Sequence, residues 1–150
     1  IAVEPNPAAL IRLKYNVSLN DLTDKLTILP VGIGIKGEFN LVSSGDLGSA
    51  CIRLDASGTQ TAKVSIVPLL DILFEQKIEK LHGVKIDIEG MEDRALMPFF
   101  KKAPSNLWPN CVVIEHCNRV HWEEDVIDYM LQSGYIIVHK NKSNLVLKRK

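Results

Sequence analysis

The sequence predicts an α/β fold with a mostly parallel sheet and an antiparallel hairpin near its C-terminal end. Short apolar segments alternate with amphipathic segments near the N-terminus and again after Val67. This alternation is typical of parallel strands joined by helices. The last two strand-like segments, residues 135–138 and 144–147, have no helix between them. Parallel pairing needs a long crossover connection, so these two strands should be antiparallel.

Length and composition indicate one domain over residues 1–150, since 46% of the residues are hydrophobic and can form a sizeable core. The 18 Lys and Arg residues balance the 18 Asp and Glu residues, apart from a basic run at 148–150. This balance argues against nucleic acid as a partner. No apolar run reaches the roughly 18 residues that a membrane span needs. Three cysteines make no paired disulfide framework, so we predict a reducing, cytoplasmic location.

In the first half of the chain, an apolar strand over residues 1–4 leads into a helix over residues 7–19. Asn6 is a good N-cap, and proline is favoured at the first helical position, here Pro7. Apolar residues at helical spacing then follow through Val17. The pattern predicts further strands at 26–33, 39–43, 50–54 and 62–67, with a turn at 43–46.

The second half repeats the alternation of helix and strand. Pro68 opens a helix that runs to about Phe74, and residues 84–88 form an apolar strand that ends near Gly90. A helix over 91–102, which Pro98 could kink, precedes a buried strand over 111–114. A last helix over 122–132 ends at Gly134 before the hairpin.

Gly32, Gly34 and Gly37 have the spacing of a dinucleotide-binding loop. That loop must open a helix whose N-terminus faces the pyrophosphate. A strand-like segment follows instead, so we interpret the glycines as a bend into a hairpin.

Three predicted strands end in acidic residues: Glu4, the pair Asp87 and Glu89, and Glu115. Ligands of open α/β sheets bind at the carboxyl ends of the strands, which makes these acids the main candidates for a site. A carboxylate such as that of Glu4 can accept hydrogen bonds from both hydroxyls of a ribose. The alternative is a solvated acid or an ionic partner of a nearby lysine.

The segment VKIDIEGMED, residues 84–93, places Lys85, Asp87 and Glu89 on one face of a strand and the isoleucines on the other. Charges beside a buried strand are costly unless they line a site. The alternative is that Glu89 caps the next helix and that Glu92 and Asp93 favour its positive end. This helix-end role explains Glu92 and Asp93 better than it explains Asp87.

Glu115 and His116 follow the next strand. His116 could act as a general base near neutral pH, or it could be an ordinary hydrogen-bonded histidine. A metal site of Asp87, Glu115 and His116 is another alternative. A zinc site of Cys111, Cys117 and His121 matches no common spacing, so we predict no metal.

Two motifs resemble the FkbM family of S-adenosylmethionine-dependent methyltransferases. They are IAVEPNPAALIRLKYNVSLN at residues 1–20 and VKIDIEGMEDRAL at residues 84–96. The family pattern is Glu-Pro-Asn-Pro after a strand, a helix ending in Asn-x-x-x-Asn, and a later Lys-x-Asp-x-Glu-Gly with a downstream acid and Leu. The matching residues are Glu4, Pro5, Asn6, Pro7, Asn16, Asn20, Lys85, Asp87, Glu89, Gly90, Glu92 and Leu96.

The resemblance implies a seven-stranded Rossmann-like methyltransferase sheet that binds S-adenosylmethionine. Glu4, with Pro5 and Asn6 of the same motif, would hold the cofactor through its ribose. The reaction would be O-methylation of a hydroxyl on a sugar, glycan or natural product. Asp87, Glu89, Glu115 and His116 would face this acceptor as candidate catalytic residues, with the general base left open.

The sequence departs from the family pattern in one respect. The family's first strand and glycine-rich loop should precede Ile1, and the sequence does not contain them. We therefore expect the chain to be a fragment of a methyltransferase domain, with unpaired strand edges beside the missing central strand. The alternative is a binding or scaffold module that has lost catalysis. An NAD-type half-domain would need a glycine fingerprint that opens a helix, and the sequence has none. The acceptor and the oligomeric state stay open.

Overall fold

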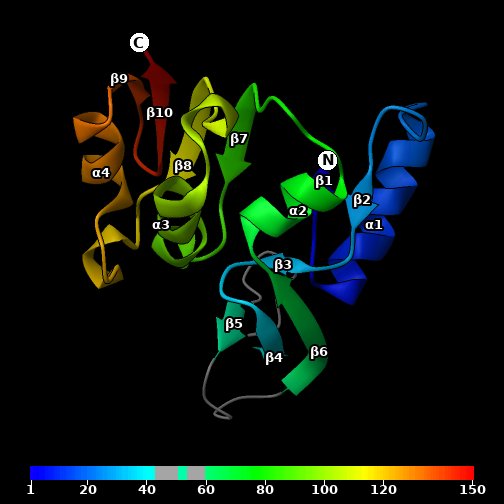
Figure 1. The fold of residues 1–150 in the computed structure, drawn as a ribbon. Helices are drawn as coiled ribbons and strands as arrows, with labels where there is room; N and C mark the ends of the chain where they lie inside the picture. Colours follow the sequence, from blue (N-terminus) through cyan, green and yellow to red (C-terminus); the bar gives the residue numbers. More distant parts are fainter. Residues whose placement is uncertain (43–50, 54–59) are drawn as a thin grey trace. The chain divides into compact units, whose positions relative to one another are not determined.

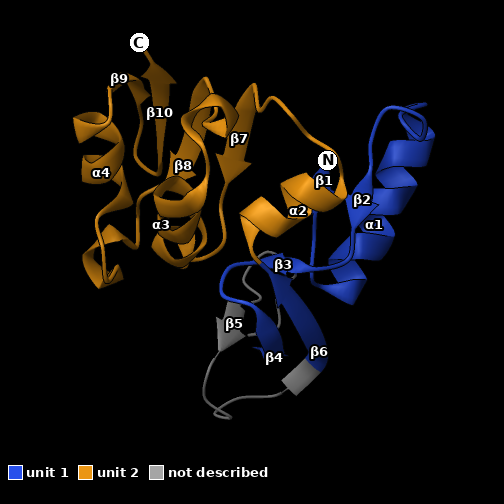
Figure 2. Cartoon of the chain, in the orientation of Figure 1, with its two compact units in different colours: residues 1–67 blue, residues 68–150 orange. Residues whose placement is uncertain are grey.

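The computed structural model describes residues 1–42, 51–53 and 60–150 (Figure 1). Within these residues the chain has a mixed α/β fold with four α-helices and three sheets. It forms two compact units, residues 1–67 and residues 68–150, which we call unit 1 and unit 2 (Figure 2).

The first sheet of unit 1 joins β1 (Ala2–Val3) and β2 (Ile28–Leu29) in parallel, with α1 (Pro7–Leu19) between them in the chain. The bounds of α1 are those expected from the sequence. The backbone N–H of Ala8 donates to Asn6 Oδ1 at 3.0 Å, which confirms the N-cap. Val17 is the buried residue of this helix.

The second sheet of unit 1 has the order β3-β6-β4-β5. Its strands are β3 (Gly32–Ile33), β4 (Gly37–Val42), β5 (Cys51–Arg53) and β6 (Gln60–Val67). Its core is formed by Leu41, Val64 and Ile66. The strand expected over 26–33 is divided into β2 and β3 around Pro30, whose missing N–H cannot join a ladder.

The glycine spacing of residues 32–37 lies between β3 and β4, and no helix follows it. The expected hairpin is nevertheless wrong, because β3 and β4 pair with opposite edges of β6 and not with each other. The turn expected at 43–46, and the ends of the strands expected over 39–43 and 50–54, fall wholly or partly outside the described residues.

The sheet of unit 2 has the order β7-β8-β10-β9. Its strands are β7 (Gly83–Ile86), β8 (Cys111–Glu115), β9 (Tyr135–Lys140) and β10 (Asn144–Arg149). β7 and β8 are parallel, with Ile86 opposite Ile114. β9 and β10 form the expected antiparallel hairpin, and β10 also pairs antiparallel with β8.

The helices of unit 2 are α2 (Leu69–Glu75), α3 (Glu92–Lys102) and α4 (Val126–Gln132), with 3-10 turns η1 (Ser105–Leu107) and η2 (Arg119–His121). α3 continues through Pro98. Its Phe100 ring lies 6.1 Å from Tyr129 of α4 and 6.0 Å from Tyr135 of β9, so these elements share one core.

Two expectations need correction. The last helix begins at Val126 and not at residue 122, because Asp125 is its N-cap and residues 119–121 form η2 instead. The sheets are mixed and not mostly parallel: three of the seven pairings between described strands are parallel. Short connections such as the β9–β10 turn allow only antiparallel pairing.

No helix in the described parts of the chain is long and apolar enough to cross a membrane.

Candidate functional site

Asp87, directly after β7, and Glu115, the last residue of β8, lie at one edge of the unit 2 sheet. Because the two strands are parallel and Ile86 is opposite Ile114, Asp87 and Glu115 occupy the next positions at their carboxyl ends. Asp87 is exposed, and its Oδ2 accepts from Lys85 Nζ at 3.0 Å. β7 ends at Ile86, so the strand face expected to carry Lys85, Asp87 and Glu89 does not extend to the two acids. Glu115 is half-buried and is the last residue of β8. The sheet therefore places two of the four predicted catalytic residues at the carboxyl ends of neighbouring strands.

Glu89 lies in a tight turn between β7 and α3. Its backbone has a φ of 58°, and Gly90 follows with a φ of 95°, so two consecutive residues are left-handed. A Cβ placed on Gly90 would lie 3.0 Å from Asn118 Cβ. The glycine thus allows this turn to pack closely against the segment that follows β8.

The environment of this edge raises the pKa of two acids, Glu89 and Glu115. Partial loss of hydration raises the pKa of Glu89, although the residue is largely exposed, and the negative charges of Asp87 and Glu92 raise it further. Burial also raises the pKa of Glu115, as do the charges of Asp87, Glu92 and Glu89, while a hydrogen bond from Cys117 lowers it. The carboxylates are therefore close enough to affect one another across the two strands.

One oxygen of Glu115 is buried without a hydrogen-bond donor. Glu115 Oε2 is buried and has no hydrogen-bond partner, and neither does Asn144 Oδ1 of the facing strand. Asn144 is directly opposite Glu115 in the β8–β10 ladder. Buried acceptors normally have a donor, so a donor group is expected at this point.

His116, the fourth predicted catalytic residue, lies beside the β9–β10 turn. Its backbone N–H donates to Ser143 O at 2.9 Å, and its Nε2 lies 3.4 Å from Asn141 O. A carbonyl oxygen can only accept, so a hydrogen bond at this contact requires the tautomer with its proton on Nε2. The other ring nitrogen, Nδ1, is then the one that could act as a base.

The sequence did not indicate the long-range contacts of Glu92 and Asp93. Both side chains are buried, at 1% and 3% exposure, although they stand in the first turn of α3. Glu92 Oε2 accepts from Trp122 Nε1 at 3.2 Å, and Asp93 Oδ2 accepts from the backbone N–H of Glu123 at 2.8 Å. They join α3 to the segment between β8 and α4, and no local spacing in the sequence indicates a contact over about thirty residues.

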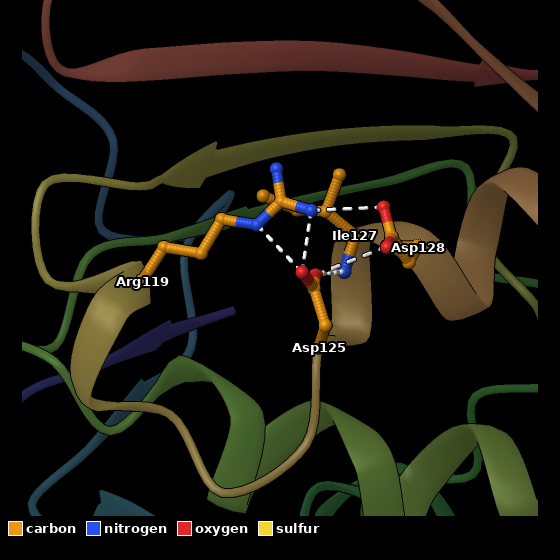
Figure 3. Close-up of polar contacts among 4 residues, drawn as sticks. All are labelled: Arg119, Asp125, Ile127 and Asp128. Carbon is orange, nitrogen blue, oxygen red and sulfur yellow. Dashed lines mark hydrogen bonds and ion pairs between the residues drawn. The ribbon is translucent and has the colours of Figure 1, made fainter.

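The far end of that segment is held by Arg119. Its Nε and Nη2 donate to Asp125 Oδ2 at 2.8 and 2.5 Å, and Nη2 also donates to Asp128 Oδ1 at 2.8 Å (Figure 3). The other carboxylate oxygen of Asp125 accepts from the backbone N–H groups of Ile127 and Asp128, which caps α4. The hydrogen bond with Asp125 raises the pKa of Arg119. The segment is thus anchored to both α3 and α4.

The predicted cofactor residues Glu4, Pro5 and Asn6 lie in unit 1, directly after β1. Glu4 is half-buried, and its Oε1 accepts from the backbone N–H of Asn6 at 2.7 Å. Asn6 is buried, and its own side chain caps α1. The motif therefore orients one carboxylate at the end of a strand.

Metal binding was one alternative for the residues at the ends of β7 and β8. Among the described residues, no group of three or more His, Cys, Asp or Glu side chains could hold a metal ion. That finding includes the sets Asp87–Glu115–His116 and Cys111–Cys117–His121, all of whose members are described.

Comparison with known proteins supplies one match. Residues 1–137 match the family described as the methyltransferase FkbM domain. The match covers most of the 150 residues and extends over both units. No curated protein and no solved structure gives a significant match to the chain.

Proposed function

The chain belongs to the FkbM methyltransferase family, and we propose that it transfers a methyl group from S-adenosylmethionine to a hydroxyl of a sugar, glycan or other natural product. Family membership supports the methyltransferase part of this proposal. The observation that supports a hydroxyl acceptor is the buried Glu115 Oε2, which lacks a donor at the carboxyl ends of β7 and β8. A hydroxyl is such a donor.

The residues after β1 fit the ribose of the cofactor. Glu4 offers a half-buried carboxylate with one oxygen held by the Asn6 N–H, which leaves its other oxygen without a partner among the described residues. Asn6 and Pro5 would act by fixing this orientation, since the Asn6 side chain is already committed to the cap of α1. The cofactor would supply an electrophilic methyl group on a sulfonium.

On the acceptor side, Glu115 is the best candidate for the general base. A raised pKa makes its carboxylate a stronger base than an ordinary glutamate, and Oε2 has no donor that would compete for the hydroxyl proton. This role requires that binding of the acceptor opens a path to Oε2, because that atom is buried. Asp87 and Glu89 would orient the acceptor from the β7 end, and His116 would contribute through Nδ1.

The proposal includes a single Rossmann-like domain that contains both units, and the extent of the family match supports this.

The experiment is calorimetric titration of S-adenosylhomocysteine into the full-length protein and into Glu4→Ala. Loss of even one hydrogen bond to a charged group should weaken binding roughly tenfold. Asp24→Ala, which removes an exposed acid of unit 1, is the control and should bind like the parent protein. Equal affinity of Glu4→Ala would remove Glu4 from the cofactor site. A folded full-length protein that binds no S-adenosylhomocysteine would favour the scaffold alternative.

A further inference from the structure

The backbone at Glu89 is strained. A left-handed backbone conformation is energetically unfavourable for any residue that has a side chain, whereas glycine adopts it easily. Glu89 adopts this conformation, with a φ of 58°, directly before Gly90. Such residues persist only where the surrounding structure holds them, and they are concentrated at functional sites. The contacts of this turn show what holds Glu89.

The carboxylate of Glu92 spans the strained residue. Glu92 Oε1 accepts from the backbone N–H of Ile88 at 2.9 Å and from that of Gly90 at 3.3 Å, the two neighbours of Glu89 in the chain. Its other oxygen accepts from Trp122 Nε1. With three N–H donors and 1% exposure, the side chain is fully committed to these contacts.

The partner of Glu92 is itself held in place. Asp93 accepts from the backbone N–H of Glu123, next to Trp122, and Arg94 Nη2 pairs with Glu123 Oε1 at 2.7 Å. Three consecutive residues of α3 therefore bind the segment that carries Trp122. This arrangement leaves Glu92 little freedom to move away from the turn.

We propose that Glu92 is a positioning residue, which holds Glu89 in its left-handed conformation at the carboxyl end of β7 so that the Glu89 side chain faces the acceptor. This inference rests on the proposed methyl transfer for the role of Glu89. Glu92 also contributes negative charge. The charges of Glu92 and of Asp87, after β7, both raise the pKa of Glu89, and the charge of Glu89 raises that of Glu115 in β8.

The test is carbon-13 NMR of the full-length protein with the Glu89 backbone and carboxyl signals assigned. In Glu92→Gln, one oxygen remains but an amide replaces a charge, so the bonds to Ile88 and Gly90 weaken. We expect the Glu89 Cα and Cβ shifts to move toward those of a residue with negative φ, and the pKa of Glu89 to fall because a negative neighbour is lost.

Glu79→Gln is the matched control, because Glu79 is exposed and outside the site, and it should change neither quantity. A folded Glu92→Gln protein with unchanged Glu89 shifts and an unchanged Glu89 pKa would overturn the inference. Neither measurement needs a substrate. A parent protein that transfers no methyl group would therefore refute the proposed function, whereas the NMR result would decide the role of Glu92.

Glu92→Gln could fail to fold, and hydrogen exchange of the parent protein covers that case. The amide protons of Ile88 and Gly90 should exchange about tenfold or more slowly than those of a free turn, because each is bonded to Glu92. Exchange of both amides at the rate of a free turn would contradict the inference.

Discussion

The end of β7 and the first turn of α3 carry two acids each, within seven residues, and their environments are opposite. Asp87 and Glu89 are exposed, whereas Glu92 and Asp93 are 1% and 3% exposed. The buried pair accepts five hydrogen bonds from N–H groups of Ile88, Gly90, Trp122, Glu123 and Glu124. Each region contains one aspartate and one glutamate, but the two regions differ in the number of N–H groups that donate to these carboxylates.

The exposed pair has few partners. Asp87 is paired with Lys85, an exposed contact that contributes little to stability, and Glu89 accepts no hydrogen bond among the described residues. Carboxylates without internal partners are free to meet a ligand, while carboxylates with several donors hold segments together. The difference separates groups suited to chemistry from groups that maintain the fold.

The largest effect should come from the buried pair. Asp93→Ala removes a 3% exposed carboxylate that accepts from the Glu123 N–H and joins α3 to the segment before α4, so the free energy of unfolding should fall by about 1.5–3 kcal/mol. Urea denaturation followed by circular dichroism measures this change. Glu79→Ala, at an exposed site, should stay within about 0.5 kcal/mol of the parent protein. Similar losses in both variants would mean that the burial of Asp93 has no special role.

A substitution in the exposed pair, Asp87 and Glu89, should change the free energy of unfolding by a smaller amount and in the opposite direction. Glu89→Gly should raise the free energy of unfolding by about 1 kcal/mol, because glycine tolerates a positive φ. Glu89→Ala removes the same charge but keeps the strain, so it serves as the control for the electrostatic part. The difference between the two variants in thermal unfolding isolates the strain. Equal stabilities would show that Glu89 is not left-handed in solution.

The smallest effect should be the pH dependence due to Glu115. Its pKa is raised in the folded state, so the folded state binds its proton more tightly than the unfolded state does. The resulting stability is present below the unfolded pKa and is lost as pH rises through the folded pKa. From acidic to neutral pH, the parent protein should therefore lose stability relative to Glu115→Gln. Parallel curves of unfolding free energy against pH would contradict the raised pKa.

Local patterns were enough for much of the fold. Asn6 and Pro7 indicated where α1 begins, and the absence of a helix between residues 138 and 144 indicated the antiparallel hairpin. The start of α4 was misplaced, because the apolar spacing continues upstream of Asp125 into a segment that is held by contacts distant in sequence. The arrangement of β3 and β4 around β6 was also missed, since glycine spacing does not specify which strand lies between them.

The sequence by itself determined which residue types stand at the strand ends, and its two motifs identified the family that the domain comparison confirms. These features are local, because capping, side-chain alternation and motif spacing depend on neighbours in the chain. Only the tertiary structure decided that Asp87 and Glu115 lie at the carboxyl ends of neighbouring strands, and that Glu92 is buried where it bonds Trp122 and the Glu89 turn. Strand register and long-range packing set the number of donors around each acid, and that number distinguishes the structural acids from the candidates for catalysis.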